Sequence, residues 1–178
     1  MSYQATLQSW HEFYSITGEG AASLVGLLFV GLSLHLRMVL SHPDVRALAR
    51  VTLSNFILVL VLALFMVIPD DAPSDTGWEL IGLGTLSFLY IGPSLIRGVR
   101  SEQHAIGLRL VLLRFGLSGL SFIGVIVCGI ALETGNYHTA LEWLVAVTVV
   151  VLVVSLRNTW DLLVSVGAAT YESDDTSG

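Results

Sequence analysis

Five stretches of about 20 predominantly apolar residues follow one another along the chain, and they limit its fold more than any other feature. They lie at about 18–38, 46–68, 77–97, 108–132 and 140–163. An α-helix rises about 1.5 Å per residue, so about 20 apolar residues cross the hydrocarbon core of a bilayer. A water-soluble core would interrupt each stretch with polar residues every few positions. The pattern predicts an all-α, polytopic integral membrane bundle of about five transmembrane helices.

The composition agrees with this fold class and excludes others. Hydrophobic residues make up 54% of the chain and charged residues 12%, whereas about 25% of a soluble domain is charged. The net charge is −6, and all eight basic residues are arginines. An acidic chain without a basic run is a poor candidate for nucleic-acid binding. The single cysteine, Cys128, cannot form an intramolecular disulfide.

Local sequence signals mark where several of these helices begin. The segments 76–79 and 139–142 both have the Thr-x-x-Glu spacing of a capping box. Trp78 and Trp143 lie in or beside the two boxes, as expected where an amphipathic ring sits at a membrane interface. Pro43 follows Ser41 closely and gives a third start. The first two helices are therefore joined by a few residues and are predicted to be antiparallel neighbours.

The regions outside the five stretches complete the predicted organisation. Tyr3, Leu7, Trp10 and Tyr14 recur at helical spacing, which predicts a short interfacial amphipathic helix in segment 1–17. Residues 18–168 form the transmembrane domain. Residues 169–178 form a polar cytoplasmic tail.

The charges are sorted by loop, and this predicts the orientation. Basic residues are retained on the cytoplasmic side during insertion. With five spans, one side holds only acidic residues, namely Glu12, Glu19, Asp70, Asp71, Asp75, Glu79, Glu133 and Glu142. The other side holds every basic residue, namely Arg37, Arg46, Arg50, Arg97, Arg100, Arg109, Arg114 and Arg157. We therefore expect the N-terminus outside and the C-terminus in the cytoplasm, in the plasma membrane of a bacterium or archaeon.

Polar residues within the stretches are the candidate site residues, because such groups are costly in hydrocarbon and usually face a cavity or a partner. Glu19, Asn55, Arg114, Asn158 and Asp161 are candidates for an ion path or for interhelical polar contacts. Arg114 and Asp161 lie at similar predicted depth on neighbouring helices, so they could pair. Glu19 is expected near a helix N-terminus, where the helix dipole stabilises a carboxylate.

Small residues in the first stretch are candidates for close helix packing. Gly18, Ala22 and Gly26 recur every four residues, and Gly31 lies further on. Such residues let helix backbones approach closely, either within one chain or between subunits.

The sequence predicts no metal site, no cofactor and no enzymatic activity. The five histidines fall near the ends of the predicted helices, and no two have a recognised ligand spacing. The chain also has no nucleophile and base motif, phosphate loop or HExxH sequence.

Parts of the first and last helices resemble a known family. The run 10–13, Trp-His-Glu-Phe, is followed by an alanine- and glycine-rich helix at 21–33, and Arg46-Ala47 and the run 158–163 also fit. This pattern resembles small bacterial multi-pass membrane proteins named modulator of FtsH protease. Glu19-Gly20 departs from the pattern, where small apolar residues are expected. The resemblance implies an accessory role beside a membrane protease, and it assigns no site residues.

Two functions are consistent with these features. The first is a non-enzymatic membrane protein that acts through helix–helix contacts as an accessory, modulating or structural subunit. Its partners would be the lipid bilayer and either further copies of itself or another integral membrane protein. The alternative is an oligomeric cation channel or small transporter with an acidic outer vestibule.

Overall fold

The computed structural model describes residues 3–41, 43–68, 72–100 and 108–175, and every regular element among these residues is a helix. The helices are α1 (Tyr3–Leu34), α2 (Leu36–Ser41), α3 (Pro43–Val67), α4 (Pro73–Arg100), α5 (Leu108–Glu133) and α6 (Tyr137–Asp175). The all-α prediction is confirmed.

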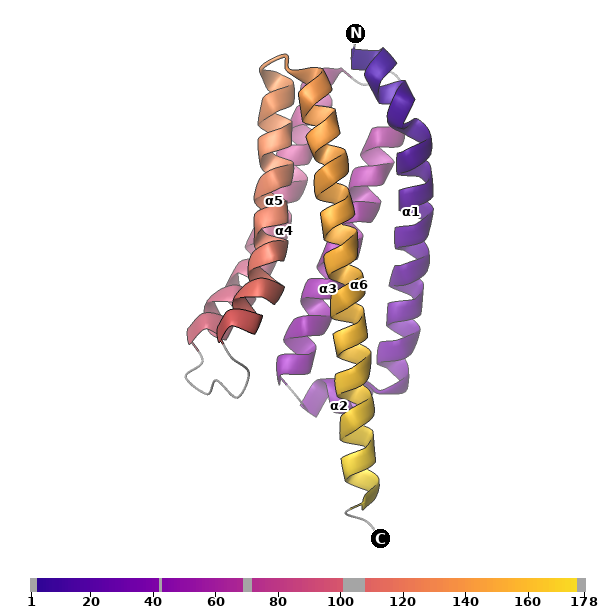
Figure 1. Ribbon diagram of the computed structural model, residues 1–178, viewed down its shortest axis with the longest axis vertical. Coiled ribbons are helices and arrows are strands. Elements are labelled where there is room, and N and C mark those ends of the chain that lie inside the picture. Colours follow the sequence, from indigo (N-terminus) through magenta and orange to yellow (C-terminus); the bar gives the residue numbers. More distant parts are fainter. Residues whose placement is uncertain (1–2, 42, 69–71, 101–107, 176–178) are drawn as a thin grey trace.

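The five long helices lie alongside one another in alternating directions (Figure 1). The N-terminus lies at one end of the bundle and the C-terminus at the other (Figure 1). The short helix α2 lies in the connection between α1 and α3, which pack together as neighbours. Gly135 has a φ of 83° in the tight turn between α5 and α6, a conformation that glycine adopts without strain.

Among the described residues, four helices are long and apolar enough to cross a membrane. Their mean hydropathies are 1.5 for α1, 2.2 for residues 45–67 of α3, 1.9 for residues 116–133 of α5 and 2.3 for residues 137–164 of α6. The helix α4 is not one of the four. It covers the third predicted stretch, and its described side chains end at Pro93.

The first helix differs from its predicted form. The segment 1–17 was expected to lie in the interface plane as a short separate helix, but residues from Tyr3 onward are continuous with the first span in α1. The stripe of Tyr3, Leu7 and Tyr14 is buried against other helices. Tyr3 shares a hydrogen bond of 2.8 Å with Thr76, at the start of α4. Neither a proline nor a capping motif separates the stripe from the span, and protein rather than lipid covers the stripe.

The C-terminal segment also differs from its predicted form. The helix α6 continues to Asp175, so most of segment 169–178, which was predicted as a polar tail, is helical.

The core of the bundle is built around α3. In the most apolar 18-residue segment of α3, 56% of the residues are buried, whereas the corresponding segment of α1 has 22% of its residues buried. Leu58, Val59 and Leu62 are fully buried in the main cluster. A second cluster joins Phe56 of α3 to Leu28 of α1 and Leu162 of α6. The helix α3 is therefore central, and α1 lies at the periphery.

Glycines bring α4 and α5 into backbone contact, and these two helices run side by side (Figure 1). A Cβ atom added at Gly129 would lie 2.7 Å from the carbonyl oxygen of Gly77. A Cβ atom at Gly84 would lie 3.0 Å from the carbonyl oxygen of Phe122. Side chains larger than hydrogen do not fit at these points, so glycine permits the close approach.

Candidate functional site

Asn55 forms an interhelical polar contact in the interior. Its side chain is fully buried on α3, and Nδ2 donates a hydrogen bond of 2.9 Å to Oγ of Ser118 on α5. A hydrogen bond of this kind between transmembrane helices contributes about 0.6–2 kcal/mol. Asn55 therefore joins two helices that make few other direct contacts.

Asn158 lies in the buried seam of α6. Only 1% of its surface is exposed. The neighbouring hydroxyls of Ser155 and Thr159 donate to carbonyl oxygens one turn earlier in the same helix. Within the described part of the chain, Nδ2 of Asn158 and Oδ1 of Asn55 are buried without a hydrogen-bond partner. The described interior thus holds polar atoms that no protein atom satisfies, among them this donor, this acceptor and the hydroxyl of Tyr14.

The surroundings of Glu19 differ from those predicted. It was expected at a helix N-terminus, but it lies in the middle of the continuous helix α1. Tyr3 contacts Thr76 and stacks on Tyr137, with ring centroids 5.7 Å apart, so α1 begins level with α4 and α6. At about 1.5 Å per residue, Glu19 is about 24 Å along α1 from Tyr3. Its side chain is exposed on the outer surface of the bundle, and no helix dipole is close enough to stabilise it.

The predicted pairing of Arg114 with Asp161 lies partly outside the described side chains. Arg114 falls within α5, but its side chain is not among those described. Asp161 is half-buried on α6 and makes a polar contact of its own.

The four small residues of the first stretch occupy different environments. Gly18 faces the core, where an added Cβ atom would lie 3.1 Å from Cβ of Ala63 on α3. Ala22 and Gly26 are exposed, and a Cβ atom at Gly26 would meet no atom within 4 Å. At Gly31 the nearest atom would be Cδ2 of Leu163, 3.9 Å away. Of the four, Gly18 alone makes a tight contact within the bundle.

The tightest glycine contacts lie between the third and fourth stretches, outside the four residues named above as packing candidates. Gly129 belongs to a small-residue pattern that is visible in the fourth stretch, but Gly77 and Gly84 of α4 were not recognised as packing residues. Their separation of seven residues, which places two glycines on one helix face, is the sequence signal that could have identified them.

An apolar groove lies between α1 and α6. Its volume is about 190 Å³, and six leucines line it together with Gly31 and Thr159, namely Leu24, Leu27, Leu28, Leu32, Leu162 and Leu163. A surface of this kind suits hydrocarbon and offers little to an ion.

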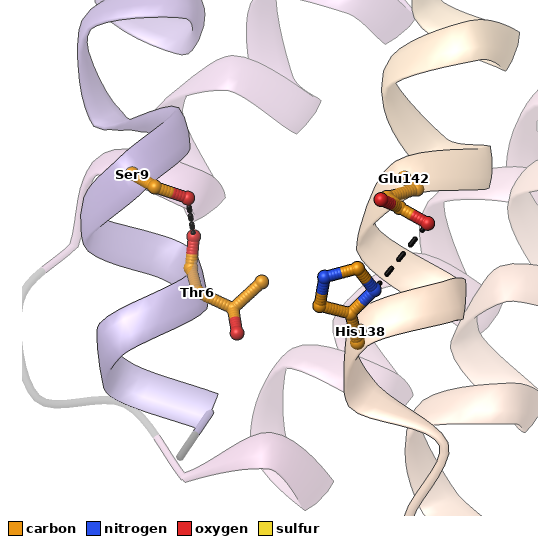
Figure 2. A network of polar contacts seen from close by, with 4 residues as sticks. All are labelled: Thr6, Ser9, His138 and Glu142. Carbon is orange, nitrogen blue, oxygen red and sulfur yellow. Dashed lines mark hydrogen bonds and ion pairs between the residues drawn. The ribbon is translucent and has the colours of Figure 1, made fainter. Parts of the chain in front are cut away.

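Polar side chains gather at the end of the bundle where α1 and α6 begin. Figure 2 shows Thr6 and Ser9 of α1 opposite His138 and Glu142 of α6. Nδ1 of His138 lies 3.3 Å from Oε2 of Glu142, and both side chains are more than half exposed. Among the residues that the structure describes, no group of three histidine, cysteine or acidic side chains could hold a metal ion.

These features define the class of protein. The bundle exposes large aliphatic side chains such as Leu120, Val127 and Val153 along its outer surface, as a surface in contact with lipid does. Trp78 and Trp143 are exposed near the starts of α4 and α6, and Trp160 is exposed near the end of the apolar part of α6 at residue 164. Tryptophans commonly border a bilayer at such positions. The chain is a helical, membrane-embedded protein.

Comparisons of the chain with protein-family models, with curated proteins and with solved structures give no match.

Proposed function

We propose that the protein is a non-enzymatic integral membrane protein that acts through helix–helix contacts as an accessory, modulating or structural subunit of a membrane complex. The interior packing is the observation that carries this proposal. The largest buried side chains, including Tyr14, Phe56 and Phe122, fill the space between the helices. The polar contact between Asn55 and Ser118 joins α3 to α5, and both side chains are buried. The resemblance to proteins named modulator of FtsH protease supports an accessory role.

Five spans, with the N-terminus outside and the C-terminus in the cytoplasm, form part of this proposal. The alternating directions of the five long helices and the opposite positions of the termini support an odd number of spans (Figure 1). Glu79 and Glu142 lie near the starts of α4 and α6, whereas Arg50 and Arg157 lie toward the other end of the bundle. This distribution supports arginine retention on the cytoplasmic side.

The alternative function, a cation channel or small transporter, has one specific observation in its favour. Oδ1 of Asn55 and Nδ2 of Asn158 are buried polar atoms without a partner among the described residues, and a bound water or ion could satisfy such atoms.

Ion flux distinguishes the two functions. The full chain is reconstituted into vesicles loaded with a cation-sensitive dye, and flux of K⁺, Na⁺ and H⁺ is measured beside protein-free vesicles. The accessory function predicts equal leakage in both preparations. Flux that depends on the protein and that disappears in Asn55→Ala or Glu19→Gln would establish the channel and remove the accessory function.

A further inference from the structure

Two amide side chains in the interior each carry a polar atom that no protein atom satisfies among the described residues. Asn55 of α3 is fully buried, and its Oδ1 accepts no hydrogen bond there. Asn158 of α6 is 1% exposed, and its Nδ2 donates none. One atom is an acceptor and the other is a donor, yet no hydrogen bond joins them directly. Leaving such atoms unsatisfied in an apolar interior is costly, and native interiors satisfy them with protein or with ordered water.

The packing of α5 on α6 shows the level at which Asn55 lies. A Cβ atom at Gly124 of α5 would lie 3.0 Å from the side chain of Val147 on α6, so these two residues are level. Ser118, which accepts the hydrogen bond from Asn55, lies six residues before Gly124. Because α5 and α6 run in opposite directions, the residue of α6 at the level of Ser118 is Val153, six residues after Val147.

Asn158 lies close enough to this level for one water molecule to join the two amides. It is five residues after Val153, so its Cα atom is about 7.5 Å further along α6. The side chains of a helix lean toward its N-terminus, which for Asn158 is the direction of Asn55. The lean brings the separation of the amides toward the roughly 5.5 Å that two successive hydrogen bonds through one water span. The helices α3 and α6 pack together, and both amides are buried.

Ser155 supplies a third polar group between the two amides. It is fully buried on α6, one turn before Asn158 and therefore on the same face. Its hydroxyl donates to the carbonyl oxygen of Val151 at 2.7 Å, which leaves lone pairs of Oγ that can accept a hydrogen bond. The three groups thus offer two acceptors and one donor. Buried waters in proteins make about three hydrogen bonds of this kind.

We propose that a water molecule is enclosed between α3, α5 and α6, where it donates to Oδ1 of Asn55 and Oγ of Ser155 and accepts a hydrogen bond from Nδ2 of Asn158. The chemistry of these atoms selects the occupant. A metal cation is repelled by the N–H groups of Asn158 and an anion by Oδ1 of Asn55, whereas water both donates and accepts. The water joins α6 to the two helices that Asn55 and Ser118 connect. It is a structural water within the bundle, and its presence does not depend on the accessory function.

Solid-state NMR of the unaltered chain tests the site directly. The chain is labelled with ¹⁵N in its asparagines, reconstituted into phosphatidylcholine vesicles, and examined for transfer of polarisation from water protons to the side-chain amides. The chain has three asparagines, and Asn136, exposed in the turn between α5 and α6, is the positive reference. The amide of Asn158 should also receive polarisation from water, although its side chain is buried.

Matched variants assign that water contact to the proposed site. Asn55→Leu removes one acceptor and fills space beside the water, so transfer to Asn158 should fall at least about threefold, because the water loses one of about three partners. Thr148→Val is the control, since Thr148 is also fully buried on α6 but bonds to the carbonyl oxygen of Leu144. It should leave the transfer to Asn158 unchanged. The measurement on the unaltered chain decides the proposal even if Asn55→Leu fails to fold.

Three results would overturn the inference. Absence of any water contact at Asn158 would show that protein satisfies its amide. Transfer that is unchanged in folded Asn55→Leu would show that the water does not bridge the two amides. A shift of the Asn55 or Asn158 signals when Na⁺ is replaced by K⁺ or Cs⁺ would assign the site to a cation. The first two results leave the accessory function untouched, whereas the third would favour the channel.

Discussion

Replacing Gly129 by alanine should separate α4 from α5, because the backbones of these helices touch at that point. The new Cβ atom would lie 2.7 Å from the carbonyl oxygen of Gly77 and 3.2 Å from the amide nitrogen of Ile81. Close carbon-to-oxygen contacts between helices measure about 3.3–3.6 Å, so the helices must separate by roughly 0.6 Å or more. Backbone atoms cannot rotate away as the end of a flexible side chain can.

The size of the effect follows from a matched control. Gly116 is also in α5, and a Cβ atom added there meets no atom within 4 Å. Each glycine-to-alanine change brings the same gain in helix propensity, about 1 kcal/mol. The difference in free energy of unfolding between Gly129→Ala and Gly116→Ala therefore isolates the overpacking, which is expected to be about 1–3 kcal/mol.

Unfolding in mixed micelles of mild detergent and SDS, followed by tryptophan fluorescence, measures this difference. Gly129→Ala should unfold at a lower SDS fraction than Gly116→Ala. If the two variants unfold together, or if Gly129→Ala is the more stable, the backbone contact between α4 and α5 is not present in the folded protein.

Three further predictions concern other parts of the bundle. A double-mutant cycle with Asn55→Ala and Ser118→Ala should give a coupling energy of about 0.6–2 kcal/mol in the same unfolding assay, whereas purely additive effects would exclude their hydrogen bond. Tyr3→Phe removes the hydroxyl that is hydrogen-bonded to Thr76 and should lower the free energy of unfolding by about 1 kcal/mol. An unchanged free energy of unfolding would show that this hydrogen bond does not stabilise the packing of α1 on α4. Thr134→Cys, in a chain with Cys128→Ala, should react with a membrane-impermeant maleimide on intact cells, and labelling only after lysis would reverse the proposed orientation.

Much of the fold could be predicted because bilayer thickness leaves a strong signal in sequence. The runs ending near Val67 and Glu133 follow from hydropathy, and the start of α3 at Pro43 follows from the proline in its first turn. The polar contact of Asn55 also followed from the rule that a buried amide seeks a partner. Its partner, Ser118, is separated by 63 residues in sequence, and no local pattern identifies it.

The two incorrect predictions, a separate interfacial helix and a helix N-terminus at Glu19, have a common physical cause in α1. The aromatic stripe around Tyr14 and the carboxylate of Glu19 together resemble an interfacial helix followed by a membrane edge. Tyr14 is buried in the main cluster, whose other members come from helices far along the chain. Because tertiary packing covers the stripe, the helix can continue through Gly18 and Gly20 without a break. Glu19 is consequently left in the middle of a long helix.

The helix α4 shows that small residues can attach a helix to a membrane bundle. It contains glycine, serine and threonine residues among its apolar side chains. Two of those glycines, Gly77 and Gly84, allow its backbone to touch α5. Within a membrane, association gains little from hydrophobicity because lipid is equally apolar, and close van der Waals packing takes its place. The glycines of α4 therefore contribute to the bundle through the close approach that they allow, which larger side chains at the same positions would prevent.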